Sequence, residues 1–416
     1  MNRTVASIFS GLAALAPAFV ATTSQSATPG AWITVWAASP QTADSDDPLA
    51  KIDAQTVRER VRVSAGGSRL RIRLSNAFGS TPIVVGAISI ALPTSAADVQ
   101  ADSIKTLTFR GRRQVNLTPG MAILSDPVDF PLNPGAEVSV SLYFPQAAGT
   151  ATQHALALKR AVISPRGDFT GHAHIDSQTT SESSTLIDAV LVPSHRRQRL
   201  LVALGDSITD GAGSTTDSDR SWPNDLARRL IELSPHGAKF AVVNEGISGN
   251  QLLHDGIGVS ALARFDRDVL SLPGVTHAIV LEGINDIGWP GAILNGQLLS
   301  PASSEPTIQD LIRGYRQLIA RAHARHVKLI GATLPPFEGV TVPGYYSEAK
   351  ETKRLAVNQW IRTSGAFDGV VDFDAALRDP EHPSRLQARY ASQDHLHPND
   401  AGYQAMADAV DVKLLR

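Results

Sequence analysis

Hydrophobic positions in the first half of the chain recur mostly at every second residue. Residues 69–74 alternate strictly between basic and apolar side chains, and residues 138–142 alternate between apolar side chains and serine. Glycine- and proline-containing turn clusters, such as those at 118–120 and 133–135, separate the short runs. Many short alternating segments between turns are typical of an antiparallel β-sandwich or jelly roll. We therefore expect an N-terminal β-domain over residues 28–195.

The pattern changes at about residue 200. Five continuous or nearly continuous apolar runs follow, at 200–204, 240–243, 278–281, 327–330 and 370–373. Segments of helical period alternate with them, at 222–233, 259–270, 308–324, 347–363 and 400–414. Runs of this kind predict strands that are buried on both faces of a parallel sheet. Residues 196–416 are therefore expected to form a doubly wound α/β domain, and the polar stretch 176–184 to be a loop or linker.

The first residues have the layout of a targeting segment. A short basic start leads into a mainly apolar run over residues 5–21, and small and polar residues follow it. A membrane anchor is the alternative, but the run is short for the ~20 apolar residues of a span, and Ser7, Gly11 and Pro17 interrupt it. We expect a secretory signal peptide over residues 1–27, a secreted or periplasmic protein, and no membrane association after its removal.

Composition and charge narrow the chemistry. The 416 residues include no cysteine, which excludes disulfides, thiolate nucleophiles and cysteine-ligated metals. Thirty-eight basic and 40 acidic residues give a net charge of −2, so no overall positive field attracts nucleic acid. Two short basic clusters, at 110–113 and 196–199, are expected to be solvated surface or interdomain contacts. The chemistry must come from oxygen and nitrogen groups.

Residues suited to acyl transfer follow the predicted strands. Ligands of open α/β sheets bind at the carboxyl ends of the strands, and the polar segments 205–211, 244–250 and 282–286 come directly after three of them. Ser207 is a candidate nucleophile, which needs a base such as His397 and a ring-orienting acid such as Asp394. The backbone N–H groups of Ser207 and Gly249 and the side-chain amide of Asn285 are candidate oxyanion donors.

Other interpretations of these residues stay open. Ser207 could cap a turn, Asn285 could be a turn residue, and Gly249 could be the entry to a helix. His395 could compete for the role of His397, although the spacing from Asp394 favours His397. The His-x-His pairs at 172–174 and 395–397 suggest a metal, but neither has a convincing third ligand, so we expect no metal and no cofactor.

These three segments and residues 394–398 together resemble the blocks of the SGNH/GDSL hydrolase superfamily. The family's serine, glycine, asparagine and histidine would fall on Ser207, Gly249, Asn285 and His397, and its aspartate on Asp394. Ile208 stands where a leucine gives the motif its name. The resemblance implies a flavodoxin-like three-layer α/β/α domain with five parallel strands and a serine ester hydrolase that works through an acyl-enzyme.

The first half carries a second resemblance. Residues 34–41, TVWAASPQ, and 73–79, RLSNAFG, are similar to the N-terminal β-domain of secreted SGNH esterases in the XynE-like group, which is linked to plant-polysaccharide deacylation. The resemblance implies short acyl esters as substrates, acetyl esters foremost, on a small molecule or a polysaccharide. The alternatives are an acyltransferase with the same site, a lipase or lysophospholipase, and a non-catalytic carbohydrate-binding protein.

Two long connections, at 287–306 and 334–346, flank the predicted site. Long loops in compact domains tend to be functional. Their aromatic residues are expected to line an acyl or sugar pocket, and the alternative is that they pack against one another. These residues are Trp289, Phe337, Tyr345 and Tyr346.

Overall fold

The computed structural model describes residues 31–149, 151–177, 179–194, 198–234 and 239–415. Residues from 31 onward form one compact unit. The predicted signal peptide, at 1–27, and the predicted boundary between residues 195 and 196 lie outside the described residues, so both stay predictions. Within the described ranges, no helix has the length and apolar character needed to cross a membrane.

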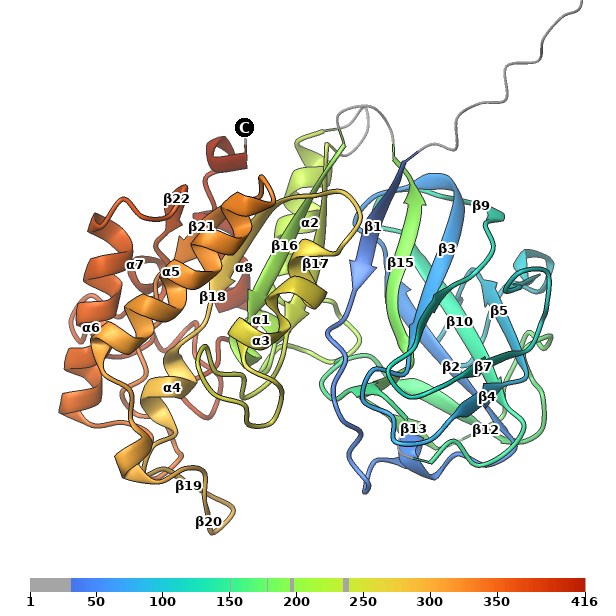
Figure 1. The fold of residues 1–416 in the computed structure, drawn as a ribbon, viewed down its shortest axis with the longest axis horizontal. Helices are drawn as coiled ribbons and strands as arrows, with labels where there is room; N and C mark the ends of the chain where they lie inside the picture. The colour runs from blue at the N-terminus through green and yellow to red at the C-terminus, as the bar shows by residue number, and fades with distance from the viewer. Residues whose placement is uncertain (1–30, 150, 178, 195–197, 235–238, 416) are drawn as a thin grey trace, which may run out of the picture. The chain divides into compact units, whose positions relative to one another are not determined.

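A five-stranded parallel sheet forms the centre of the second half (Figure 1). Its order is β17-β16-β18-β21-β22, and every neighbouring pair is parallel. In order of appearance the strands are β16 (Arg199–Gly205), β17 (Phe240–Gly246), β18 (Val275–Leu281), β21 (Lys328–Ala332) and β22 (Gly369–Val371). The order 2-1-3-4-5 is the flavodoxin-like one. The predicted doubly wound domain with five parallel strands is confirmed.

Helices contact one another in two groups, as a three-layer arrangement requires. α2 (Trp222–Glu232) contacts α8 (Asp400–Ala409), which contacts α7 (Phe373–Leu377). In the other group, α5 (Ile308–Ala324) contacts both α3 (Ala261–Phe265) and α6 (Glu348–Thr363). The bounds of α5 agree with the prediction because a capping box of Thr307 and Asp310 starts the helix.

Several predicted element ends are wrong. The predicted helix at 259–270 is α3 followed by a π-helical turn, η3 (Asp266–Leu270), and the helix at 400–414 stops at Ala409 before a 3₁₀ turn, η5 (Val412–Leu415). The run at 370–373 leaves the sheet at Val371, because the side chain of Asp372 accepts the N–H of Ala375 and starts α7. Short helices directly after strands, including α1 (Ser207–Asp210) and α4 (Ile284–Gly288), were not predicted.

The first half is the predicted antiparallel β-rich region. One sheet has the order β1-β15-β3-β8 with β9 also on β3, and the other has the order β13-β12-β2-β10-β5-β6; all these pairs are antiparallel. The strands are β1 (Trp32–Ala37), β2 (Gln55–Arg62), β3 (Gly67–Ser75), β5 (Ala87–Ala91), β6 (Lys105–Thr106), β8 (Ala122–Leu124), β9 (Val128–Leu132), β10 (Glu137–Phe144), β12 (Ala161–Arg166), β13 (Thr180–Ser181) and β15 (Ile187–Pro193). This half also has two two-stranded pairs, β4 (Ile83–Val85) with β7 (Val115–Leu117) and β11 (Gln153–His154) with β14 (Ser184–Thr185). A further pair, β19 (Ile293–Leu294) with β20 (Gln297–Leu298), lies in the α/β half.

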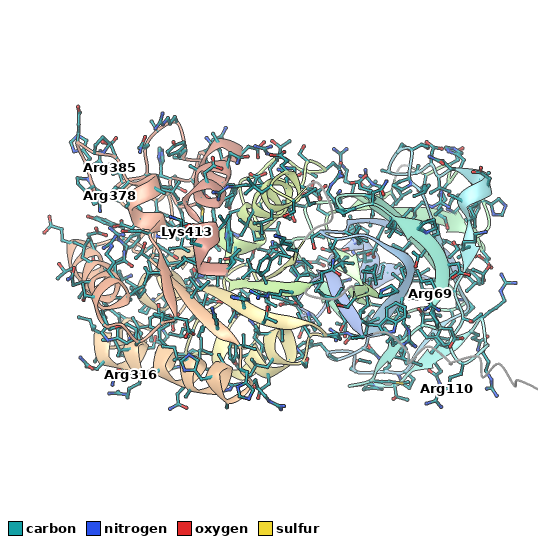
Figure 2. All side chains as sticks on the ribbon, turned by 90° about the horizontal axis from the view of Figure 1, so that it is seen from above. Arg69, Arg110, Arg316, Arg378, Arg385 and Lys413 are labelled. Carbon is teal, nitrogen blue, oxygen red and sulfur yellow. The ribbon has the colours of Figure 1, made fainter. Side chains whose placement is uncertain are left out.

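The polar stretch at 176–184 is a loop of the β-rich region and does not link the two halves. It contains β13 and leads into β15, which lies between β1 and β3 in the first sheet. The apolar run 189–192 is buried there, which explains why the chain returns to this region after the polar stretch. The basic cluster at 110–113 is exposed, and Arg110 points outward (Figure 2).

Candidate active site

Ser207 lies at a sharp turn from strand to helix. β16 ends at Gly205, where a Cβ atom would overlap Thr209 Oγ1 and lie 2.7 Å from the carbonyl oxygen of Leu281. Asp206 caps α1 because its side chain accepts the N–H of Ile208 at 2.9 Å. The turn places Ser207 as the first residue of α1, with 8% of its surface exposed.

A chain of hydrogen bonds joins Ser207, His397 and Asp394. His397 Nε2 is 2.7 Å from Ser207 Oγ, and His397 Nδ1 is 2.5 Å from Asp394 Oδ2. An ionised carboxylate can only accept, so Nδ1 carries the proton and the lone pair of Nε2 faces the serine hydroxyl. This is the tautomer that a general base for Ser207 requires.

The carboxylate of Asp394 is held in its ionised form. Its Oδ1 accepts the backbone N–H groups of Leu396 and His397, each at 2.9 Å, and the hydroxyl of Ser392 at 2.7 Å. Burial alone would raise the pKa of Asp394, but the hydrogen bond and the charge of His397 and the other donors hold that pKa well below its usual range. Asp394 is therefore available as an acceptor for the imidazole ring.

Asn285 lies in α4, directly after β18, with its amide oriented by two contacts. Its Nδ2 donates to the carbonyl oxygen of Asn250 at 2.8 Å, and its Oδ1 accepts the hydroxyl of Tyr345 at 2.7 Å. Because the carbonyl oxygen of Asn250 can only accept, the amide nitrogen must face it, which leaves the amide oxygen to accept the hydroxyl of Tyr345. One N–H of Nδ2 is used by Asn250, and the second is the donor available to an oxyanion.

Gly249 lies in the turn that follows β17. Its φ is +74°, and a Cβ atom there would lie 2.5 Å from Ile257 Cδ1 and 2.8 Å from Trp289 Cζ2. Both the conformation and the close neighbours require glycine at this position. The turn is fixed by the N–H of Asn250, which donates to the carbonyl of Ile247 at 3.0 Å.

Two of the four predicted pocket aromatics contact the candidate donors, and the other two pack against each other. Trp289 is buried against Gly249, and Tyr345 is buried with its hydroxyl on Asn285. Phe337 is fully buried and packs edge-on against Tyr345 and Tyr346, with ring centroids 6.0 and 5.2 Å apart. Tyr346 is half-buried. The contact of these residues with substrate stays a prediction, and the packing of Phe337 is of the kind expected for loops that pack against themselves.

Sequence reasoning missed two features of this site. Ile257 is 52% exposed next to Gly249, and no periodicity or motif singles it out. The contact of Tyr345 with Asn285 joins residues 60 positions apart, so spacing along the chain gave no signal of it.

His395 is exposed on the loop between Asp394 and His397, and no hydrogen bond joins it to Ser207 in the described part of the chain. In the same part, no group of three or more His, Asp or Glu side chains is placed to hold a metal ion.

Buried charged side chains contact the strand ends that carry the site. The guanidinium group of Arg264 is fully buried and donates to the carbonyl oxygens of Gly205 and Glu245 at 2.9 and 2.6 Å, and to Asn250 Oδ1 at 2.8 Å. These contacts join the ends of β16 and β17 and the glycine turn. Burial raises the pKa of Asp206 to about 7, against the opposing effect of its bond from Ile208. Asp206 is therefore a buried carboxyl group next to Ser207 whose ionised form is disfavoured by burial.

The site lies within a segment of the chain that matches a known family model. Residues 203–405 match the model of the GDSL-like lipase/acylhydrolase family. No curated protein matches the chain. Among solved structures, an aryl esterase from M. smegmatis is 18% identical with a TM-score of 0.39, over 51% of this chain and 95% of that one. A carbohydrate acetylesterase from Sinorhizobium meliloti is 14% identical (TM-score 0.39; 52% and 99% covered). A variant of an acetyl xylan esterase from Geobacillus stearothermophilus is 22% identical (TM-score 0.39; 52% and 94% covered).

Proposed function

We propose, from the premise that residues 203–405 belong to the GDSL-like lipase/acylhydrolase family, that this ester hydrolase forms an acyl-enzyme on Ser207 and acts on short acyl esters. The observation that carries the proposal is the hydrogen-bonded chain from Asp394 through His397 to Ser207, with distances of 2.5 and 2.7 Å. A serine hydroxyl becomes a useful nucleophile when a correctly protonated base lies at this distance.

The first half-reaction follows from these contacts. Ser207 Oγ attacks the ester carbonyl carbon while His397 Nε2 takes the hydroxyl proton. The carbonyl oxygen becomes an oxyanion that accepts hydrogen bonds from the N–H groups of Ser207 and Gly249 and from Asn285 Nδ2. The bond to the leaving oxygen then breaks as His397 gives that oxygen its proton, and the acyl group stays on Ser207.

Water completes the cycle. His397 removes a proton from a water molecule, whose oxygen attacks the acyl carbon, and the second oxyanion uses the same donors. Collapse of this intermediate returns the proton from His397 to Ser207 Oγ and releases the carboxylic acid. Asp394 stays ionised throughout and stabilises the imidazolium.

The surroundings of Gly249 support a preference for short acyl groups. The indole of Trp289 and the side chain of Ile257 pack closely against this glycine, and we expect them to limit the length of the acyl group. The carbohydrate part of the proposal and the export of the protein rest on the sequence, on the resemblance of residues 34–41 and 73–79 and on the composition of residues 1–27.

Acyl preference is tested with a series of p-nitrophenyl esters from acetate to octanoate. We expect kcat/KM to be highest for acetate and to fall as the chain lengthens. Ile257→Ala should raise the relative rate on longer chains, whereas Leu233→Ala, which removes another exposed apolar side chain at the end of α2, should leave the series unchanged. A maximum at octanoate in the unmodified protein would contradict the short-acyl assignment and favour a lipase.

The carbohydrate part is tested with acetylated xylan and free acetylated monosaccharides. Release of acetate from the polysaccharide, abolished by Ser207→Ala, is the expected result. Hydrolysis of the chromogenic ester without any acetate release from these carbohydrates would contradict the carbohydrate assignment and leave the esterase assignment intact.

A further inference from the structure

The β-rich region places a histidine against the loops of the candidate site. His154, in β11, is buried, and its two ring nitrogens contact different parts of the chain. Nδ1 is 2.9 Å from the carbonyl oxygen of Ser39, and Nε2 is 3.0 Å from Asp210 Oδ1. Asp210 is the last residue of α1, three positions after Ser207.

The partners of His154 fix its charge. A backbone carbonyl oxygen and an ionised carboxylate are both acceptors, so both ring nitrogens must donate. Burial alone would lower the pKa of His154, but the charge and the hydrogen bond of Asp210 raise that pKa above its usual value, which favours an ion pair between the two halves of the chain. An ion pair that is buried on both sides is strongly destabilised when one partner is lost, because the other charge remains unpaired.

Asp210 also contacts the turn that carries Gly249. Its other oxygen, Oδ2, accepts the backbone N–H and the hydroxyl of Ser248, at 3.1 and 3.2 Å. Ser248 directly precedes Gly249, whose N–H is a candidate oxyanion donor. Asp210 thus bonds the helix that carries Ser207 to the turn that carries Gly249, and His154 holds the carboxylate in place.

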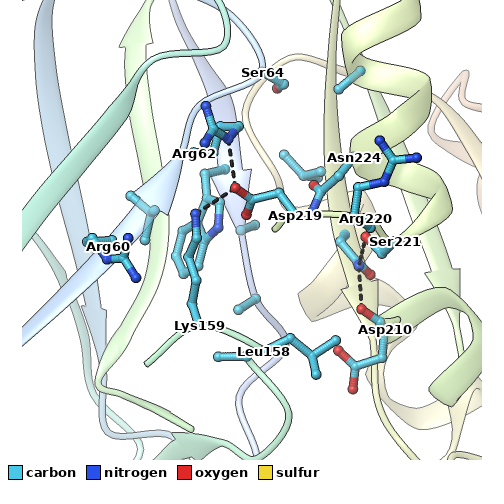
Figure 3. Close-up of a pocket in the computed structure, with 18 of the residues that line it drawn as sticks. Arg60, Arg62, Ser64, Leu158, Lys159, Asp210, Asp219, Arg220, Ser221 and Asn224 are labelled. Atoms are coloured by element: carbon cyan, nitrogen blue, oxygen red, sulfur yellow. Dashed lines mark hydrogen bonds and ion pairs between the residues drawn. The ribbon is translucent and has the colours of Figure 1, made fainter. Parts of the chain in front are cut away.

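Polar contacts are important for alignment here because the packing beside them is incomplete. A cavity of about 100 Å³ lies next to His154, lined from the β-rich region by Arg62 and Lys159 and from the α/β region by Asp210, Asp219 and other residues (Figure 3). Asp219 accepts from Lys159 at 2.6 Å and from Arg62 at 2.7 Å across it. Apolar packing is therefore not continuous next to the His154–Asp210 pair.

Ser39 supplies a second contact of the same kind. Its hydroxyl donates to Glu245 Oε2 at 2.5 Å and accepts from Arg264 at 2.9 Å. Arg264 is the buried cation that joins the ends of β16 and β17. Ser39 therefore accepts the hydrogen bond of His154 through its carbonyl oxygen and also contacts, through its hydroxyl, the buried charged residues next to the strand end that carries Ser207.

We propose that His154 is a positioning residue of the active site, which acts through Asp210 to hold the turn 247–250 in register with α1. The β-rich region then contributes to the geometry of the active site and is not a separable module. This inference rests on the proposed function, because it assigns His154 to the same oxyanion site.

The test compares His154→Leu, which removes both donors, with His154→Gln, which can still donate one hydrogen bond to Asp210. We expect kcat on p-nitrophenyl acetate to fall about 10- to 100-fold in His154→Leu, with KM changed less than threefold, because a displaced oxyanion donor lowers transition-state stabilisation more than substrate binding. His154→Gln should recover a large part of that loss. A general packing defect would not be relieved by a single restored donor.

Two further variants keep the test decisive. His277→Gln removes another buried histidine, near the amino end of β18, and should lower the melting temperature without the loss of kcat. If His154→Leu does not fold, Asp210→Asn takes its place and should show the same loss in kcat at nearly constant KM. The inference is overturned if kcat in these variants stays within twofold of the unmodified protein, or if His277→Gln loses as much kcat at an equal loss of melting temperature. An inactive unmodified protein, or full activity in Ser207→Ala, would instead refute the proposed function itself.

Discussion

The hydroxyl group of Tyr345 is predicted to act on catalysis only through Asn285. Its buried hydroxyl donates to Asn285 Oδ1 at 2.7 Å, and burial raises the pKa of Tyr345 well above its usual value, so the hydroxyl keeps its proton over the working range of pH. Tyr345→Phe removes that donor, adds no bulk and leaves a buried amide oxygen without its partner. The amide can then rotate away from the orientation in which Nδ2 faces the oxyanion.

The expected magnitude follows from the two bonds involved. An unsatisfied buried acceptor costs about 1–3 kcal/mol, and an oxyanion donor contributes about 2.7–4 kcal/mol to transition-state stabilisation. If reorientation removes part of the donor's contribution, kcat in Tyr345→Phe should fall about 5- to 50-fold with KM nearly unchanged. Asn285→Ala, which removes the donor itself, should lower kcat about 100- to 1,000-fold.

A double-mutant cycle isolates the connection. The assay is steady-state hydrolysis of p-nitrophenyl acetate by the unmodified protein, both single variants and the double variant. Because Tyr345 is expected to act through the amide, Tyr345→Phe should have almost no effect on kcat when Asn285 is already alanine. If its effect persists in full in the Asn285→Ala background, or if Tyr345→Phe alone retains full activity, the assigned role of Tyr345 is refuted.

Three other predictions concern the triad acid, the glycine turn and a buried carboxyl group. Asp394→Asn should lower kcat at pH 7 about 10³- to 10⁴-fold by changing the His397 tautomer. The pKa of Asp394 is depressed in the folded protein, so the ionised carboxylate stabilises the fold above the unfolded pKa of about 3.9, and this stabilisation is lost as the pH falls. In urea titrations, the loss of stability caused by Asp394→Asn should therefore shrink below pH 4 and should not grow. Gly249→Ala should lower kcat about 10- to 1,000-fold because its Cβ would meet Trp289, and activity within twofold of the unmodified protein would exclude Gly249 as a donor. Burial raises the pKa of Glu59 to about 8, so between about pH 4.3 and 8 the folded state binds a proton that the unfolded state has released, and the free energy of unfolding should fall as the pH rises through this range. In urea titrations, Glu59→Gln should flatten this dependence of stability on pH. Curves of stability against pH that run parallel for the variant and the unmodified protein would disprove the raised pKa.

The pattern of apolar residues predicts the α/β half well because its elements are long and periodic. The range of α5 agrees with its predicted bounds, and all five sheet strands contain or overlap their predicted runs. The residues of the candidate site could be predicted from the sequence for a related reason. The carboxyl ends of parallel strands meet at one edge of a sheet, so Ser207, Gly249 and Asn285 could be expected together although they are far apart in sequence.

The remaining features depend on tertiary contacts that leave no local signal. α1 and α4 are too short to show a helical period, and each is fixed by a tight turn at a strand end. The contacts of Tyr345 with Asn285 and of His154 with Asp210 join residues 60 and 56 positions apart. A buried tyrosine and a buried histidine look like ordinary core residues until the partner of each polar atom is known.

Covalent trapping of the nucleophile tests the central claim most directly. The purified protein is treated with a fluorophosphonate, which mimics the tetrahedral intermediate, and the adduct is located by peptide mass spectrometry while ester hydrolysis is followed in parallel. We predict one adduct per chain, on Ser207, with activity lost in proportion to labelling, and we predict that Ser207→Ala shows neither labelling nor hydrolysis. An active protein whose adduct lies on another residue, or a Ser207→Ala variant that still hydrolyses the ester at the original rate, would contradict the account.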